Sequence, residues 1–74
     1  MGMIHSTAII DPSSKIDPSV EVGAYVIIGP DVQIGSDCLV EPHAQICGSV
    51  RIGNENSIGR GAIIGANPQD LSFN

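Results

Sequence analysis

The sequence is poor in positive charge. Its 74 residues contain three cations, Lys15, Arg51 and Arg60, against eight carboxylates, so the formal net charge is −5. Nucleic acids and anionic membrane surfaces are bound by clusters of Lys and Arg, and this chain has no such cluster. We therefore expect no nucleic-acid partner, and we expect any partner surface to be neutral or basic.

The sequence also lacks a long apolar stretch. No run of apolar residues approaches the ~20 that a membrane-spanning helix needs, and no basic segment followed by an apolar run opens the chain. The sequence predicts no membrane span and no secretion signal, so a cytoplasmic location is the default expectation.

Cysteine, histidine and threonine are scarce. Cys38, Cys47, His5 and His43 show no pairwise spacing typical of metal ligands, so the sequence predicts no metal and no cofactor. The two cysteines occupy different positions of the repeat described below, which predicts reduced thiols, with Cys38 filling the core. Thr7 is the only threonine, and an ice-binding threonine ladder is therefore disfavoured.

Isoleucine or valine recurs at every sixth position. These eleven anchors are Ile4, Ile10, Ile16, Val22, Ile28, Ile34, Val40, Ile46, Ile52, Ile58 and Ile64. A period of six fits neither a helix nor a heptad, but it suits a chain that turns a corner after each short strand. Three hexapeptides make a triangular coil, so the sequence predicts an all-β parallel β-helix of about four coils, with three apolar ladders.

The other repeat positions agree with corners between short strands. Glycine follows six of the eleven anchors, and four of the five prolines lie two residues after an anchor. Small or turn-tolerant residues suit a corner, and proline there removes no ladder hydrogen bond. The core of so short a chain is thin and its end strands are unpaired. We therefore expect self-association or a longer parent chain.

The repeat breaks near the C-terminus. The next anchor position holds Asp70, and residues 66–71 depart from the hexapeptide rule. We predict a β-helix over residues 1–65 and a projecting loop over residues 66–74, at the start of a substrate site. The alternative is the frayed end of a truncated β-helix, with Asp70 in solvent.

The motifs resemble those of the UDP-N-acetylglucosamine O-acyltransferases of lipid A synthesis, a family of hexapeptide-repeat acyltransferases. The most specific match is Ile64-Gly65 followed by Gln69-Asp70-Leu71. Further matches are Ile28-Gly29-Pro30, Cys47-Gly48, Ile52-Gly53 and the run from Asn56 to Ile58. The resemblance extends over essentially the whole chain.

The resemblance implies a left-handed β-helix, whereas the general rule for strand crossovers favours a right-handed one. It implies a cytoplasmic homotrimer that transfers a hydroxyacyl chain from acyl carrier protein to a hydroxyl of UDP-N-acetylglucosamine. Gln69, Asp70 and Leu71 would contact substrate, the polar pair binding hydroxyls and the leucine the acyl chain. Ser72 stands where the family usually has a basic residue, while Phe73 keeps the aromatic.

The same resemblance predicts that these 74 residues are inactive alone. Transfer to a hydroxyl requires a general base, which in the family is a histidine on a later coil, and His5 and His43 do not match it. The sequence predicts no catalytic residue. Two alternatives remain: a non-catalytic β-helix that supports trimerisation or structure, and another hexapeptide enzyme such as an acetyltransferase.

Overall fold

Ten two-residue strands form the structure, a computed structural model that describes residues 2–65. The strands are β1 (Ile9–Ile10), β2 (Lys15–Ile16), β3 (Glu21–Val22), β4 (Ile27–Ile28), β5 (Gln33–Ile34), β6 (Leu39–Val40), β7 (Gln45–Ile46), β8 (Arg51–Ile52), β9 (Ser57–Ile58) and β10 (Ile63–Ile64). In every strand the second residue is an anchor that turns inward, and the first is exposed. The described range contains no helix, and therefore none that could cross a membrane.

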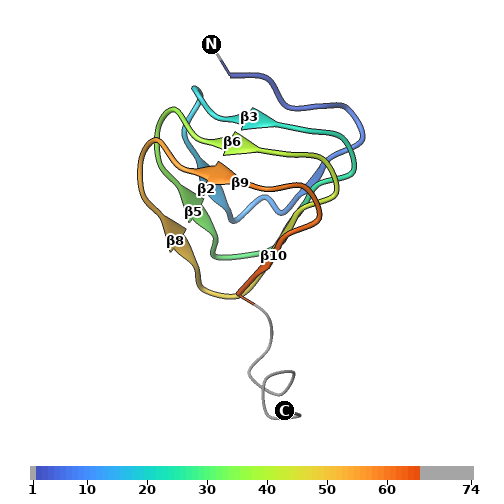
Figure 1. The fold of residues 1–74 in the computed structure, drawn as a ribbon. Coiled ribbons are helices and arrows are strands. Elements are labelled where there is room, and N and C mark those ends of the chain that lie inside the picture. Colours follow the sequence, from blue (N-terminus) through green and yellow to red (C-terminus); the bar gives the residue numbers. More distant parts are fainter. Residues whose placement is uncertain (1, 66–74) are drawn as a thin grey trace.

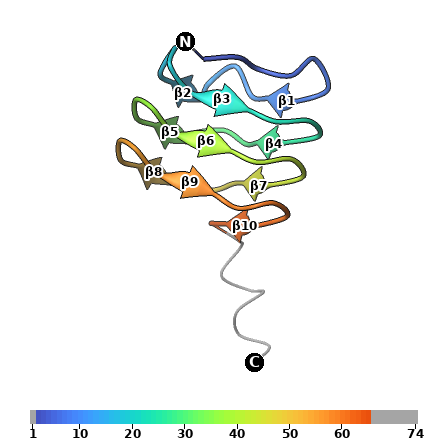
Figure 2. The ribbon, with the colours of Figure 1, turned by 45° about the horizontal axis from the view of Figure 1, so that its top comes forward.

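The strands stack into three parallel sheets, which form the sides of a triangular prism (Figures 1 and 2). The sheet orders are β1-β4-β7-β10, β2-β5-β8 and β3-β6-β9. Partners lie one coil apart in sequence, as in the pairs Ile10 with Ile28 and Ile28 with Ile46. The predicted ladders are confirmed, and a bridge between Ile4 and Val22 adds an eleventh side to the ten strands. Eleven sides correspond to between three and four coils.

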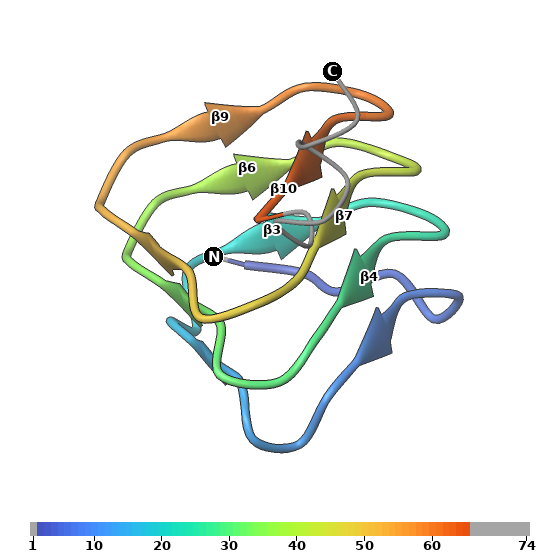
Figure 3. The same ribbon diagram turned by 90° about the horizontal axis from the view of Figure 1, so that it is seen from below.

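The coils wind with a left hand. Seen from the C-terminal end, the chain runs clockwise from β3 through β4 to β6 as it approaches the viewer (Figure 3). The hand implied by the family resemblance is therefore confirmed. The right-handed rule concerns crossovers between twisted strands, and strands of two residues are too short to accumulate the twist on which it depends.

The core is best sealed in the middle coils. Its fully buried side chains include Ile28 and Ile46 from the ladders, and Val26 and Val32, which each come four residues after an anchor. Cys38 is buried at 2% exposure, which confirms its prediction as a core filler, and both cysteines are free thiols. Anchors of the outer described coils, such as Ile10 and Ile64, are only partly buried.

The corners differ in one respect from the sequence interpretation. The left-handed backbone conformation falls mainly three residues after the anchor, at Tyr25, Asp31, Asp37, His43 and Glu55, with φ between 58° and 67°. Two of the glycines directly after the anchors, Gly23 and Gly35, allow close approach of the next coil instead. A Cβ added at Gly23, for example, would lie 2.8 Å from the nitrogen of Pro42 in the next coil.

Hydroxyl side chains of the first coil hold the corners of the second. The backbone N–H of Tyr25 donates to Thr7 Oγ1 at 2.9 Å, and that of Asp37 donates to Ser19 Oγ at 2.7 Å. A third bond of this kind joins Asp31 N to Ser13 at 3.3 Å. These bonds supply acceptors for N–H groups that the corner turns away from the strand ladders.

Candidate functional site

The predicted substrate contacts Gln69, Asp70 and Leu71 lie outside the residues that the structure describes, as does the predicted loop 66–74. In the sequence, the first two of these contacts follow residues of one described sheet by one coil length. Gln69 comes one coil length after Arg51, and Asp70 comes one coil length after Ile52. We therefore take the β2-β5-β8 sheet, which contains Arg51 and Ile52, as the candidate functional site.

A polar column runs along the outside of this sheet. Lys15 pairs with Gln33, and Gln33 pairs with Arg51, so the three exposed side chains stand directly above one another. The backbones of Lys15 and Arg51 are about 10 Å apart, because adjacent strands are spaced by about 4.8 Å. Two of the three cations of the chain thus lie on one side of the prism.

The column lies in an open depression of about 690 Å³. Its polar lining comprises Ser14, Lys15, Asp17, Gln33, Ser36, Arg51 and Asn54. Part of this lining is already engaged, since Asn54 Oδ1 accepts a hydrogen bond from the backbone N–H of Ser36 at 2.9 Å. The remaining amide, ammonium and guanidinium groups can donate hydrogen bonds to a ligand that lies along the sheet.

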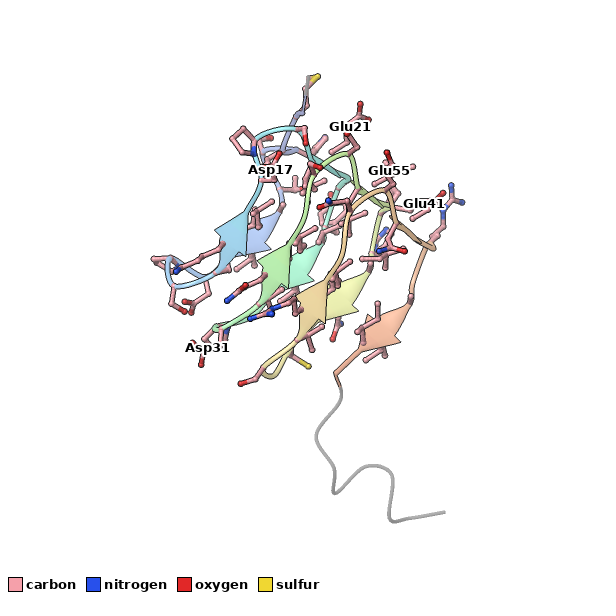
Figure 4. The ribbon with its side chains drawn as sticks, turned by 90° about the vertical axis from the view of Figure 1, so that its left-hand side faces the viewer. Asp17, Glu21, Asp31, Glu41 and Glu55 are labelled. Carbon is pink, nitrogen blue, oxygen red and sulfur yellow. The ribbon has the colours of Figure 1, made fainter. Side chains whose placement is uncertain are left out.

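Carboxylates border the polar column on both edges. In Figure 4, Asp17 and Glu55 lie along one edge of the prism and Asp31 lies along the opposite edge. Hydrogen bonds from the Ser19 hydroxyl and backbone N–H hold the pKa of Asp17 below its usual range. A strip of cations between carboxylates is unsuited to a polyanion, and it favours a ligand with many hydrogen-bonding groups and little charge.

Both histidines lie away from the polar column. His43 stacks on Tyr25, with ring centroids 5.2 Å apart, at the corner between the β3-β6-β9 and β1-β4-β7-β10 sheets. His5 Nδ1 lies 2.8 Å from Thr7 Oγ1 at the same corner. In the triangular coil this corner is opposite the β2-β5-β8 side, so neither histidine serves that side as a base.

The polar column was missed by the sequence reasoning, although a signal for it was available. Lys15, Gln33 and Arg51 each precede an anchor, and they share the coil spacing of those anchors. Comparing the residues before the anchors at intervals of one coil length would have identified them. Between residues 2 and 65 no cluster of three or more His, Cys, Asp or Glu residues could hold a metal ion.

Comparison with known proteins gives consistent results. The sequence model of the family described as bacterial transferase hexapeptide (six repeats) matches residues 31–67. The chain is 41% identical to the acyl-[acyl-carrier-protein]–UDP-N-acetylglucosamine O-acyltransferase of Chlamydia caviae, over 99% of this chain and 26% of that protein. It is 48% identical to the protein of the same name from Xanthomonas euvesicatoria, over 96% of this chain and 27% of that protein.

A solved structure shares the fold. The Arabidopsis UDP-N-acetylglucosamine acyltransferase superposes with a TM-score of 0.80 at 29% identity, covering 88% of this chain and 26% of that one. The chain therefore spans about a quarter of the length of the curated relatives that it matches.

Proposed function

The chain belongs to the bacterial transferase hexapeptide family, and we propose that it forms the N-terminal β-helical part of an acyl-[acyl-carrier-protein]–UDP-N-acetylglucosamine O-acyltransferase. The observation that carries this proposal is the 41% identity to a relative of that name over 99% of the chain. A solvent-exposed repeat position is free to vary, so identity at this level over so simple a repeat points to more than a shared fold.

The proposed reaction moves a hydroxyacyl chain from acyl carrier protein to a sugar hydroxyl of UDP-N-acetylglucosamine, in lipid A synthesis in the cytoplasm. The proposed assembly is a homotrimer. Gln69 and Asp70 hydrogen-bond substrate hydroxyls, and Leu71 contacts the acyl chain. Gln69 follows Arg51, the last residue of the polar column, by one coil length. The side chains of the column, Lys15, Gln33 and Arg51, can hydrogen-bond a sugar. Ser72 has no positive charge that could bind a phosphate group of the substrate.

These 74 residues supply binding groups and no general base. Transfer to a hydroxyl requires removal of its proton, and both histidines stand at the corner opposite the polar column. We propose that the chain alone is inactive. Acyl transfer by the isolated chain, measured with hydroxyacyl-carrier protein and UDP-N-acetylglucosamine, would contradict this.

A graft tests the proposed function. Residues 1–74 replace the matching N-terminal segment of the Chlamydia caviae relative, and acyl transfer to UDP-N-acetylglucosamine is measured. We expect the graft to be active, because the two segments are 41% identical over 99% of this chain. A graft of unchanged mass and circular dichroism that lacks activity would contradict the proposal.

The same graft tests the site. Asp70→Ala removes a charged hydrogen bond worth about 1.5–3 kcal/mol, which corresponds to a loss of about 10- to 150-fold in kcat/KM. The matched control is Asp37→Ala, a carboxylate exposed at a corner of the described coils, which should leave kcat/KM unchanged. Equal activity of the Asp70 variant and the control would remove Asp70 from the site.

A further inference from the structure

The outward strand residues of the β1-β4-β7-β10 sheet are mostly apolar, and none of them carries a formal charge. Its outward residues are Ile9, Ile27, Gln45 and Ile63, directly above one another. Three of these are exposed isoleucines, with 64%, 42% and 63% of their surface accessible. We call this set the isoleucine column. A solvated sheet surface normally carries polar side chains at such positions, so a column of isoleucines indicates a surface that is covered in the assembled protein.

A hollow lies on the neighbouring side of the prism. It has a volume of about 200 Å³ and lies over strands β3 and β6. Its outward apolar side chains are Met3, Leu39 and Pro42, and Glu21, Glu41 and His5 also line it. Met3 and Leu39 are exposed at 74% and 39%. An isoleucine side chain has four carbon groups. If each fills the ~30 Å³ that a water molecule fills in the liquid, the side chain fills about 120 Å³, and the hollow can receive one.

We propose that the isoleucine column of one copy packs against the hollow of the next copy. This inference rests on the homotrimer proposed above and names the surfaces that hold it together. Around a threefold axis two identical patches cannot face each other, so every subunit must present two different surfaces that fit one another. The protruding isoleucines and the hollow are two such surfaces on one chain.

The position of the two surfaces supports a ring of copies. The β1-β4-β7-β10 and β3-β6-β9 sides meet at the corner that carries Tyr25 and His43 (Figure 2). Both contacts therefore lie around one edge of the prism, and the polar column of the third side stays outside the ring. Charge supports only the isoleucine column as an interface, because the hollow itself is lined by Glu21 and Glu41. Two copies of net charge −5 repel each other. The outward strand residues of the isoleucine column are uncharged, so they do not add to this repulsion.

Single charges on either surface test the contact. Ile27→Glu places a carboxylate in the column, and Leu39→Glu places one in the hollow. A desolvated or like-charge contact costs several kcal/mol, so we expect the association constant to fall by at least about 100-fold for each. The mass is followed by light scattering over a concentration series, with circular dichroism as the check of folding. Ile9→Glu, at the outer end of the column, replaces Ile27→Glu if the latter unfolds.

Gln33→Glu is the matched control, because it adds the same charge at the same repeat position on the third side. It should keep the trimer. If the unaltered chain is a trimer and Ile27→Glu is also a trimer, the proposed surfaces are wrong while the trimer stands. If the unaltered chain is a monomer at every concentration, the proposed trimer itself is wrong.

A mixing experiment tests which surfaces face each other. The Ile27→Glu chain keeps an intact hollow, and the Leu39→Glu chain keeps an intact column. Equal amounts of the two should therefore form a dimer through one intact contact, although each variant alone is monomeric. Failure of the mixture to associate, with both variants folded, would overturn the pairing of column and hollow.

Discussion

Two sides of this prism have the same interior and opposite exteriors. Behind the β2-β5-β8 sheet stand Ile16, Ile34 and Ile52, and behind the β1-β4-β7-β10 sheet stands another ladder of isoleucines. On the outside, the first sheet presents Lys15, Gln33 and Arg51, whereas the second presents the isoleucine column. The inward residues are constrained by the core, so differences of function between the sides are confined to the outward residues.

The same contrast occurs within single strands. In β4, Ile27 is 42% exposed and Ile28 is 1% exposed, although the two residues are identical and adjacent. Burial, and not residue type, therefore determines how much each isoleucine contributes to the stability of the fold. The following predictions test this contrast, in order of decreasing effect.

Ile28→Ala should lower the free energy of unfolding by about 2–5 kcal/mol, because it leaves a cavity in the best-packed part of the core. Ile27→Ala is the matched control, and in dilute, monomeric chain it should change this free energy by less than about 1 kcal/mol. Urea denaturation monitored by circular dichroism measures both. Equal losses for the two variants would mean that inward and outward positions do not differ as described.

Ser19→Ala should destabilise the chain by about 1 kcal/mol. It removes the acceptor for the backbone N–H of Asp37 in the next coil, a bond of 2.7 Å. Ser57→Ala, at an exposed outward position of β9, serves as control and should have little effect on the unfolding midpoint. An unchanged midpoint in both variants would show that the hydroxyl bonds of the first coil do not stabilise the corners.

Glu55→Gly should stabilise the chain by about 0.5–1 kcal/mol, because Glu55 has a φ of 61°, where glycine avoids the clash of a Cβ. Glu21→Gly is the control, since Glu21 lies in a strand and glycine there weakens it. Thermal unfolding of the two variants should shift in opposite directions. A lower melting temperature for Glu55→Gly would contradict the assigned corner conformation.

Acid should weaken two corners of the first coil. Hydrogen bonds from the Ser13 backbone and hydroxyl lower the pKa of Asp11, and those of Ser19 lower that of Asp17. A carboxyl whose pKa is lower in the folded chain stabilises it above the unfolded pKa, and this contribution is lost as the pH falls through the folded pKa. The free energy of unfolding, measured by urea denaturation at decreasing pH, should therefore fall less for the double variant Asp11→Asn, Asp17→Asn than for the unaltered chain. The difference should appear at pH values below the usual pKa range of aspartate.

Much of the fold could be predicted because the six-residue period is unbroken from Ile4 to Ile64. Strand positions, sheet partners and the burial of Cys38 follow from that period, since an inward anchor on every side leaves a single register. The hand could not be derived from the period, because a left-handed and a right-handed coil place the same residues inside. It required the resemblance to a known family.

The corners and the outer surface were less predictable. Glycine after the anchor suggested the position of the turn, but the left-handed conformation falls on residues such as Tyr25 and His43. Their backbone N–H groups are held by acceptors in the preceding coil, such as Thr7 Oγ1 and the carbonyl of Ala24, and this is a contact between coils that no local pattern reveals. The polar and isoleucine columns are visible in the sequence only once the coil length is known.

The solution mass of the unaltered chain, measured by light scattering over a concentration series, tests most directly the claim that the isoleucine column and the polar column have different roles. The account predicts a mass of three chains, which persists when Lys15 or Arg51 is replaced by alanine and is lost when Ile27 is replaced by glutamate. A folded monomer at all concentrations, or a trimer that depends on Lys15 and Arg51 instead of Ile27, would contradict it.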